Sequence, residues 1–282
     1  MIDPTRTTNN NPGMNRRDLF VTFLAGALAA LAIVAGLSFA ATAQTANLHG
    51  VGVVYLHGKG AWPGAADGGI LSTLAEEGAL VATPEMPWSF KRKYGATYEQ
   101  AMAEIDAVAA GLKAQGATRI VVIGHSLGAN AAIGYAARHP DLLAVVALSP
   151  GHLPEAEGLR SHTQEAIAEA KQLVAAGQGD VPRRFPDMAQ GIPLTATATP
   201  LVYLSMFDPD GPAVIPKNAE AMGPVPLLWV VGTLDPIARR GPDYAFKFGA
   251  KNPKSRYIEV FAGHLTTPLA ARSQVVEWIN SL

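Results

Sequence analysis

From about residue 48 onward, short runs of apolar residues alternate with segments of helical periodicity. Runs rich in Val, Ile, Leu and Ala are typical of buried strands, and they occupy residues 48–56, 80–83, 120–123, 142–149, 201–204, 225–231 and 255–261. Helical patterns cover residues 70–77, 97–113, 127–139, 163–176 and 274–282. The alternation predicts an α/β fold, with a mostly parallel central sheet of about six strands flanked by helices.

The pattern changes between residues 151 and 200. After the predicted helix, glycine and proline recur without a clear period. This composition is typical of a lid-like excursion, or of a helix with long surface loops, rather than of a second domain with its own core. We therefore expect one domain over residues 44–282, with a lid or insertion at 151–200.

The first 43 residues differ from the rest of the chain. Arg16 and Arg17 precede a charge-free, alanine-rich run from Leu19 to about Ala43. This arrangement resembles a twin-arginine export signal, with cleavage before Gln44 and a periplasmic or secreted location for the mature chain. The alternative is a retained membrane anchor over residues 19–40, because about twenty apolar residues can span a bilayer. Membrane contact is expected only through this leader.

The composition of the chain limits the kinds of ligand and catalytic group that it can use. The chain has 282 residues, is 49% hydrophobic and carries a formal net charge of −1. A nearly neutral chain gives no electrostatic case for binding nucleic acid. The absence of cysteine excludes a thiol nucleophile, a disulfide and a cysteine-ligated metal.

A Gly-x-Ser-x-Gly pattern occupies residues 124–128, between a predicted strand and a predicted helix. A sharp strand-to-helix turn holds its central serine, Ser126, in a strained conformation. Side chains at Gly124 and Gly128 would collide with neighbouring backbone. The turn exposes the hydroxyl and aims the N-terminus of the following helix at it, which favours negative charge there.

Two further residues complete a set that acyl transfer needs. Asp235 and His264 each follow a predicted strand, and the carboxyl ends of parallel strands share one ligand-binding edge. An imidazole can take the proton of a serine hydroxyl near neutral pH, and a carboxylate fixes its tautomer. Asp208 is the rival acid, although its Asp-Pro-Asp-Gly context is typical of a turn.

The chain here resembles the α/β-hydrolase family from residue 48 to the C-terminus. The resemblance rests on residues 56–58, 124–128, 232–236 and 262–264. It implies Ser126 as nucleophile, His264 as general base and then acid, and Asp235 as the orienting carboxylate. It also implies an oxyanion hole from the backbone N–H groups of Lys59 and Leu127, and no cofactor. The family sheet usually begins with two further strands, so we expect a sheet shortened at that edge.

For several other polar and aromatic residues, the sequence gives weaker support for a place in the active site. His57, Trp62 and His152 are candidate pocket residues, although His57 also suits a structural role in the oxyanion loop. His125 is expected to be buried packing. The basic run at residues 91–93 suits a solvated loop or, alternatively, an anionic substrate. No histidine spacing typical of a metal site occurs.

Together these features predict a serine hydrolase that cleaves a small-molecule or lipid-like carboxylic ester through an acyl-enzyme on Ser126. Three alternatives remain at this point. One is an acyltransferase or thioesterase with the same triad, and another is hydrolysis of amides. The third is a non-catalytic binding or accessory protein that keeps the fold.

Overall fold

Residues 47–282 are described by the structure, which is a computed structural model. The predicted leader lies outside the described residues, so its role as an export signal or a membrane anchor stays a prediction. Within residues 47–282, no helix combines the length and the apolar character that crossing a bilayer requires.

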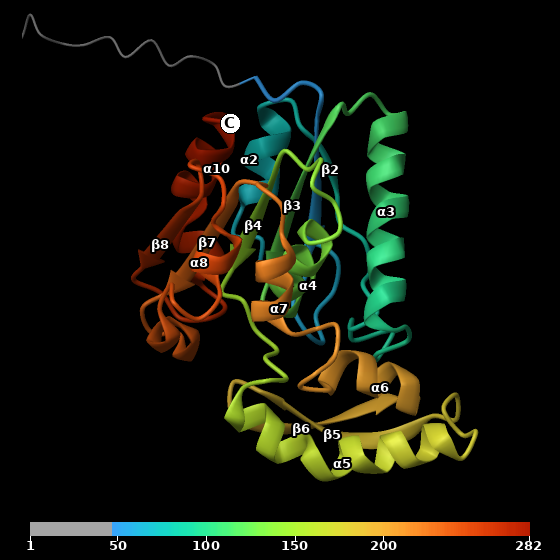
Figure 1. Cartoon of the computed structure of the whole chain (residues 1–282). Coiled ribbons are helices and arrows are strands. Elements are labelled where there is room, and N and C mark those ends of the chain that lie inside the picture. Colours follow the sequence, from blue (N-terminus) through green and yellow to red (C-terminus); the bar gives the residue numbers. More distant parts are fainter. Residues whose placement is uncertain (1–46) are drawn as a thin grey trace, which may run out of the picture. The chain divides into compact units, whose positions relative to one another are not determined.

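Six strands form one parallel sheet, in the spatial order β2-β1-β3-β4-β7-β8 (Figure 1). Their bounds are β1 Val51–Leu56, β2 Leu80–Ala82, β3 Arg119–His125, β4 Ala144–Leu148, β7 Leu227–Gly232 and β8 Arg256–Val260. Alternate side chains of the inner strands enter cores on opposite faces of the sheet. The predicted parallel sheet of about six strands, flanked by helices, is confirmed.

Helices cover both faces of this sheet (Figure 1). One face packs against α2 (Ile70–Glu76) and α10 (Arg272–Asn280). The other packs against α3 (Tyr98–Ala114), α4 (Leu127–Ala136) and α7 (Ile215–Ala221). Short helical turns complete the chain at η1 Pro236–Arg240, α8 Phe246–Gly249 and α9 Thr267–Ala270. The predicted N-cap of α3 is confirmed, because the Thr97 hydroxyl accepts from the Gln100 N–H in a capping box.

The segment after β4 forms a separate layer beside the carboxyl ends of the strands (Figure 1). It consists of α5 (Glu157–Ala175) and an antiparallel hairpin of β5 (Arg183–Ala189) and β6 (Ile192–Ala198). We call residues 151–198 the cap. The hairpin was not predicted, since its tight turn uses Gln190 and Gly191, both at positive φ, instead of a typical Asn-Gly pair.

One predicted strand is wrong. Residues 201–204 belong to a helix, α6 (Pro200–Phe207), and not to the sheet. Thr199 caps its N-terminus by accepting from the Val202 N–H, and Pro200 occupies the first helical position. Proline is well suited to that position, because its fixed φ is helical and no N–H is needed there. The local capping signal therefore outweighs the short apolar run that predicted a strand.

Candidate active site

Ser126 lies at the tip of the turn between β3 and α4, with φ 57° and ψ −119°. A Cβ on Gly124 would lie 2.1 Å from the Gly128 carbonyl oxygen, and one on Gly128 would lie 2.0 Å from the Leu56 carbonyl oxygen. Backbone atoms cannot move aside as a flexible side chain can. Glycine is therefore required at both positions, as the sequence pattern predicts.

The structure brings Ser126, His264 and Asp235 together. His264 Nε2 lies 2.9 Å from Ser126 Oγ, and His264 Nδ1 lies 2.7 Å from Asp235 Oδ2. Both distances suit hydrogen bonds. With the Nδ1 hydrogen donated to the carboxylate, Nε2 is free to accept the serine proton. Asp208, the rival acid, instead pairs with Lys171 at 2.8 Å.

Asp235 is 3% exposed, and its other oxygen accepts from the Ile237 N–H at the start of η1. Burial by itself raises the pKa of this carboxyl. The hydrogen bond to and electrostatic interaction with His264, together with hydrogen bonds from the Ile237 N–H and Ser149, outweigh burial, so the net effect lowers the pKa of Asp235 below its ordinary value. The group is therefore a carboxylate at neutral pH, as orientation of an imidazole requires.

Two further histidines hold the site in place. The His125 ring is buried, as predicted, and its Nε2 donates to the His264 carbonyl at 3.0 Å. Burial lowers the pKa of His125 to about 4, so the ring is neutral near pH 7. His57 is fully buried and donates through Nδ1 to the Gly58 carbonyl, while Nε2 accepts from the Met86 N–H. The prediction that His57 lines the pocket is wrong, because both ring nitrogens are used to fix the loop that follows β1.

The N–H groups of Lys59 and Leu127 are the predicted oxyanion donors. Leu127 begins α4, where helix geometry leaves the first N–H groups without intrahelical acceptors. Within residues 47–282, neither N–H donates to a backbone acceptor. Leu127 follows Ser126 in sequence, and Lys59 lines the same cavity as Ser126.

A cavity of about 200 Å³ contains the serine and histidine side chains. Its walls come from the oxyanion loop, the nucleophile turn, the tip of the cap hairpin and the His264 loop, and include Lys59, Ala61, Ser126, Met188, Gln190, His264 and Leu265. A second cavity of about 370 Å³ adjoins it on the His264 side, lined by α5, η1 and the hairpin tip. The cap therefore forms one wall of both cavities.

The other two candidate pocket residues have different positions. His152 lines both cavities, with Nε2 donating to the Met206 carbonyl at 2.8 Å. Burial is the main cause that lowers the pKa of His152 to about 3, so this ring is also neutral. The prediction that Trp62 lines the pocket is wrong. Its side chain is 66% exposed and contributes to neither cavity.

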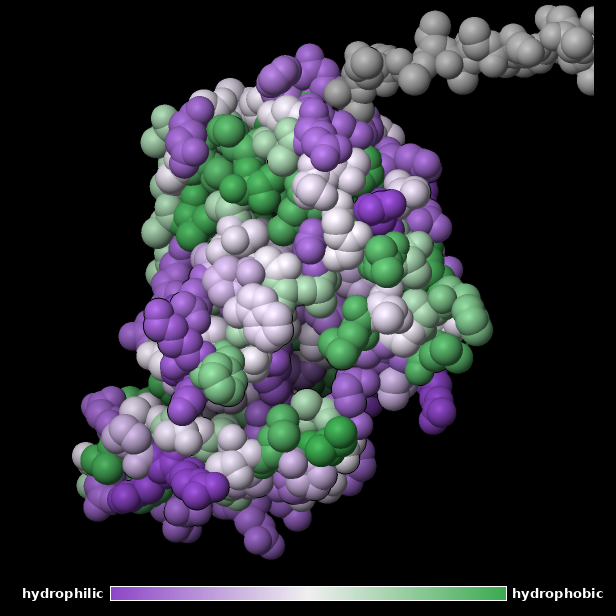
Figure 2. Space-filling view, turned by 180° about the vertical axis from the view of Figure 1, so that it is seen from behind, coloured by the Kyte–Doolittle hydropathy of each residue, from purple (hydrophilic) through white to green (hydrophobic). Residues whose placement is uncertain are grey.

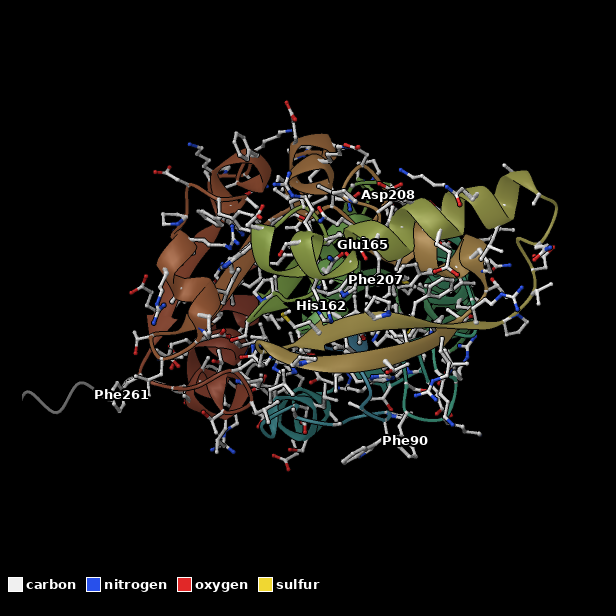
Figure 3. All side chains as sticks on the ribbon, turned by 90° about the horizontal axis from the view of Figure 1, so that it is seen from below. Phe90, His162, Glu165, Phe207, Asp208 and Phe261 are labelled. Atoms are coloured by element: carbon white, nitrogen blue, oxygen red, sulfur yellow. The ribbon has the colours of Figure 1, made fainter. Side chains whose placement is uncertain are left out.

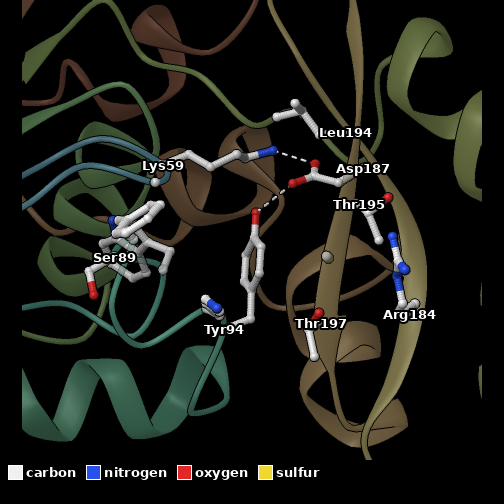
Figure 4. Close-up of a pocket in the computed structure, with 13 residues that line it drawn as sticks. Lys59, Ser89, Tyr94, Arg184, Asp187, Leu194, Thr195 and Thr197 are labelled. Carbon is white, nitrogen blue, oxygen red and sulfur yellow. Dashed lines mark hydrogen bonds and ion pairs between the residues drawn. The ribbon is translucent and has the colours of Figure 1, made fainter.

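A buried ion pair joins the cap to the oxyanion loop, and no sequence signal indicated it. Lys59 Nζ donates to Asp187 Oδ1 at 2.5 Å and to the Met188 carbonyl at 2.9 Å (Figure 4). The Tyr94 hydroxyl donates to the second oxygen of Asp187 at 3.0 Å. The residue whose backbone N–H is a predicted oxyanion donor is thus held by its side chain to the cap.

In the described part of the chain, no three His, Cys, Asp or Glu side chains are grouped so as to hold a metal ion. The site consists of a hydroxyl, an imidazole, a carboxylate and two candidate N–H donors. This set can perform nucleophilic acyl transfer without further groups.

The chain belongs to the alpha/beta hydrolase family, whose model matches residues 48–278. Comparison with curated proteins gives no significant match.

Solved structures share the fold. A monoacylglycerol lipase from Paleococcus ferrophilus is 23% identical, with a TM-score of 0.59 over 82% of this chain and 94% of that one. A Pyrococcus furiosus esterase is 20% identical, with a TM-score of 0.56 over 84% of this chain and 83% of that one. A structure from a study of two metagenome-derived lipolytic enzymes is 16% identical, with a TM-score of 0.60 over 83% of this chain and 95% of that one. At these identities the comparisons establish the fold and not the substrate.

Proposed function

We propose that the protein is a serine hydrolase that cleaves carboxylic esters through an acyl-enzyme on Ser126. The observation that carries this proposal is the continuous hydrogen-bonded chain from the Ser126 hydroxyl through His264 to Asp235. Residues from three separate loops form it, at the edge of the sheet where this family binds ligands.

In the proposed acylation step, Ser126 Oγ attacks the ester carbonyl carbon while His264 Nε2 takes the hydroxyl proton. The carbonyl oxygen becomes an oxyanion that accepts from the Lys59 and Leu127 N–H groups. Each such donor contributes on the order of 3 kcal/mol in the transition state. Collapse of the intermediate breaks the ester bond, and the leaving alkoxide receives the proton from His264.

Deacylation repeats the same steps with water. His264 takes a proton from a water molecule, whose oxygen attacks the acyl carbon. The second tetrahedral intermediate releases the carboxylic acid and restores the Ser126 hydroxyl, with the proton returned by His264. Asp235 stays ionised throughout and stabilises the imidazolium.

Ester hydrolysis is favoured over a purely binding role because the strained serine conformation is retained. A positive φ at a serine costs free energy, and such strain is typically found where it serves function. Thioesterase or acyltransferase activity would use the same groups, with a different leaving group or acceptor. We also propose that the mature protein is exported, with its N-terminus near Gln44, which N-terminal sequencing of the cellular protein would test.

The decisive experiment is labelling with a fluorophosphonate, which phosphonylates an activated serine, together with hydrolysis of a short aryl ester. The native chain should label and turn over. Ser126→Ala should lose labelling and lower kcat by about 10⁴-fold or more, with an unchanged melting temperature. Ser72→Ala is the matched control, since Ser72 is exposed on α2, bonds to the Gly69 carbonyl and lines neither cavity. A folded native chain that does not label would favour the binding role.

A further inference from the structure

Large apolar side chains that face solvent are concentrated around the mouth of the catalytic cavity. Among the described residues, eight of them follow the carboxyl ends of sheet strands or lie on the cap hairpin, and we call them the apolar rim: Trp62, Phe90, Ile192, Leu194, Leu234, Phe261, Leu265 and Leu269. The other exposed large apolar residues are Val181, Leu201 and Phe248. Phe90 is 74% exposed and Phe261 is 84% exposed.

Contacts between the loops make this rim continuous. The Phe90 N–H donates to the Ala61 carbonyl at 3.0 Å, which joins the Phe90 loop to the Trp62 loop. The Trp62 loop reaches α9, because a Cβ on Gly68 would lie 2.3 Å from the Leu269 nitrogen. The Leu234 N–H donates to the Ala262 carbonyl, beside Phe261.

The cap hairpin closes the rim on its remaining side. Ile192 and Leu194 lie on β6, and the hairpin tip lines the catalytic cavity together with Leu265. Figure 2 shows hydrophobic side chains gathered around a hollow where the cap meets the main body. In Figure 3, which looks onto the cap, Phe90 projects from the lower edge of the molecule and Phe261 from its lower left. The rim therefore presents one face and not scattered positions.

Single exposed apolar residues are ordinary, but a contiguous apolar patch around an opening marks an interaction surface. A protein partner seated on this rim would cover the mouth of the cavity that contains Ser126. A lipid surface would cover the same side chains, and lipid molecules from that surface could still enter the cavity.

Charge supports a lipid surface of negative sign. A cavity of about 340 Å³ beside Phe90 and Leu194 is lined by Lys93 and Arg184 (Figure 4). Lys91 pairs with Glu85 and Arg92 with Glu104. Lys93 and Arg184 have no carboxylate within ion-pair distance among residues 47–282. Cations next to an apolar surface are what anionic headgroups attract.

We propose that the apolar rim docks onto the surface of an anionic lipid aggregate, with the catalytic cavity facing the lipid. This inference rests on the proposed function in one respect: docking would deliver a lipid-like ester to Ser126 for hydrolysis. Docking and hydrolysis are measured separately below, so either can fail alone.

Trp62 is the reporter for docking. The other three tryptophans, Trp88, Trp229 and Trp278, are buried. The full chain carrying Ser126→Ala, which prevents consumption of lipid, is mixed with vesicles of phosphatidylglycerol and brominated phosphatidylcholine. Docking predicts a blue shift and bromine quenching of Trp62, both absent in Trp62→Phe. Because the reporter lies in the rim, anchoring through the leader alone does not produce the signal.

The rim variant is Ile192→Ser/Phe261→Ser/Leu269→Ser, which touches no cavity-lining residue. Its matched control is Val181→Ser/Leu201→Ser/Phe248→Ser, which removes the same number of exposed apolar side chains elsewhere. We expect at least about tenfold weaker vesicle binding for the rim variant and less than about twofold for the control. Replacing Lys93 and Arg184 by glutamine should weaken binding by about fivefold per charge. With the native serine, both triple variants should hydrolyse a water-soluble aryl ester normally.

Three results would overturn the proposal. One is an unquenched Trp62 in a folded protein, and another is equal loss of binding in the rim and control variants. The third is a Trp62 shift that depends on protein concentration without vesicles, accompanied by a dimer in sedimentation velocity that the rim variant abolishes. That result would assign the rim to self-association. Quenching without any ester hydrolysis would leave docking intact and refute the proposed function.

Discussion

The nucleophile turn and the cap form opposite walls of one cavity, but different interactions position them. In the turn, five consecutive residues carry the glycine pattern. The atoms that forbid a side chain are backbone oxygens: that of Gly128 for position 124, and that of Leu56 on the adjacent strand β1 for position 128. In the cap, Asp187 meets Tyr94 and Lys59 from positions 93 and 128 residues earlier in the chain. One wall is therefore marked by a short sequence pattern, although β1 also shapes it, and the other exists only through pairings of distant side chains.

The largest expected effect tests whether Asp235, and not Asp208, orients the imidazole that serves the nucleophile turn. Asp235→Asn should lower kcat/KM by about 10³- to 10⁴-fold, because an amide cannot stabilise the imidazolium or fix the reactive tautomer. Asp208→Asn is the control and should change kcat/KM by less than about threefold. An equal loss of kcat/KM in both variants would show that Asp235 does not have the orienting role.

The next largest effect tests whether the nucleophile turn requires glycine at position 128. Gly128→Ala should lower the free energy of unfolding by about 4 kcal/mol or more, since its Cβ would meet backbone at 2.0 Å. Gly111→Ala, in the last turn of α3 with no atom outside the helix's own backbone within 4 Å of the new Cβ, should instead raise it by about 0.5–1 kcal/mol. Urea unfolding measures both. Similar values for the two variants would show that the turn tolerates side chains.

The ion pair between Lys59 and Asp187 allows a test of how the cap is held against the rest of the domain. Asp187→Leu leaves the Lys59 ammonium buried without its partner, which should cost about 3 kcal/mol of stability. The double variant Lys59→Met/Asp187→Leu removes both charges and should recover most of that loss. Lys59→Met keeps the backbone N–H, so turnover should follow stability in this series. A double variant no more stable than Asp187→Leu would mean that the cap is held by other contacts.

The smallest effect concerns pH. Burial lowers the pKa of His125 to about 4, whereas an imidazole in the unfolded chain titrates near 6.5. Between these values the unfolded chain binds more protons, so the free energy of unfolding falls as pH drops through this window. His125→Gln should reduce that slope by about 1 kcal/mol per pH unit, measured by urea unfolding at pH 5 and pH 6. An unchanged slope would show that His125 becomes charged without unfolding.

Much of the site was predictable because its chemistry is carried by short patterns. The strand before Ser126, the glycines on either side of it, and the positions of Asp235 and His264 after strands all follow from local composition and the geometry of parallel sheets. Local patterns were misleading where two of them competed, as at residues 201–204, where a threonine cap and a proline at the first helical position outweigh a short apolar run. The hairpin escaped prediction because its turn residues are not the usual pair and its strands are partly polar.

The sequence by itself determined the nucleophile turn, since a serine between two glycines leaves few backbone conformations free of collision. Only the tertiary structure decided which acid reaches His264, that His57 faces inward and Trp62 outward, and that Asp187 ties the cap to the oxyanion loop. Such pairings depend on burial and on distances between residues far apart in the chain. A pattern of neighbours in sequence carries no information about a partner a hundred residues away.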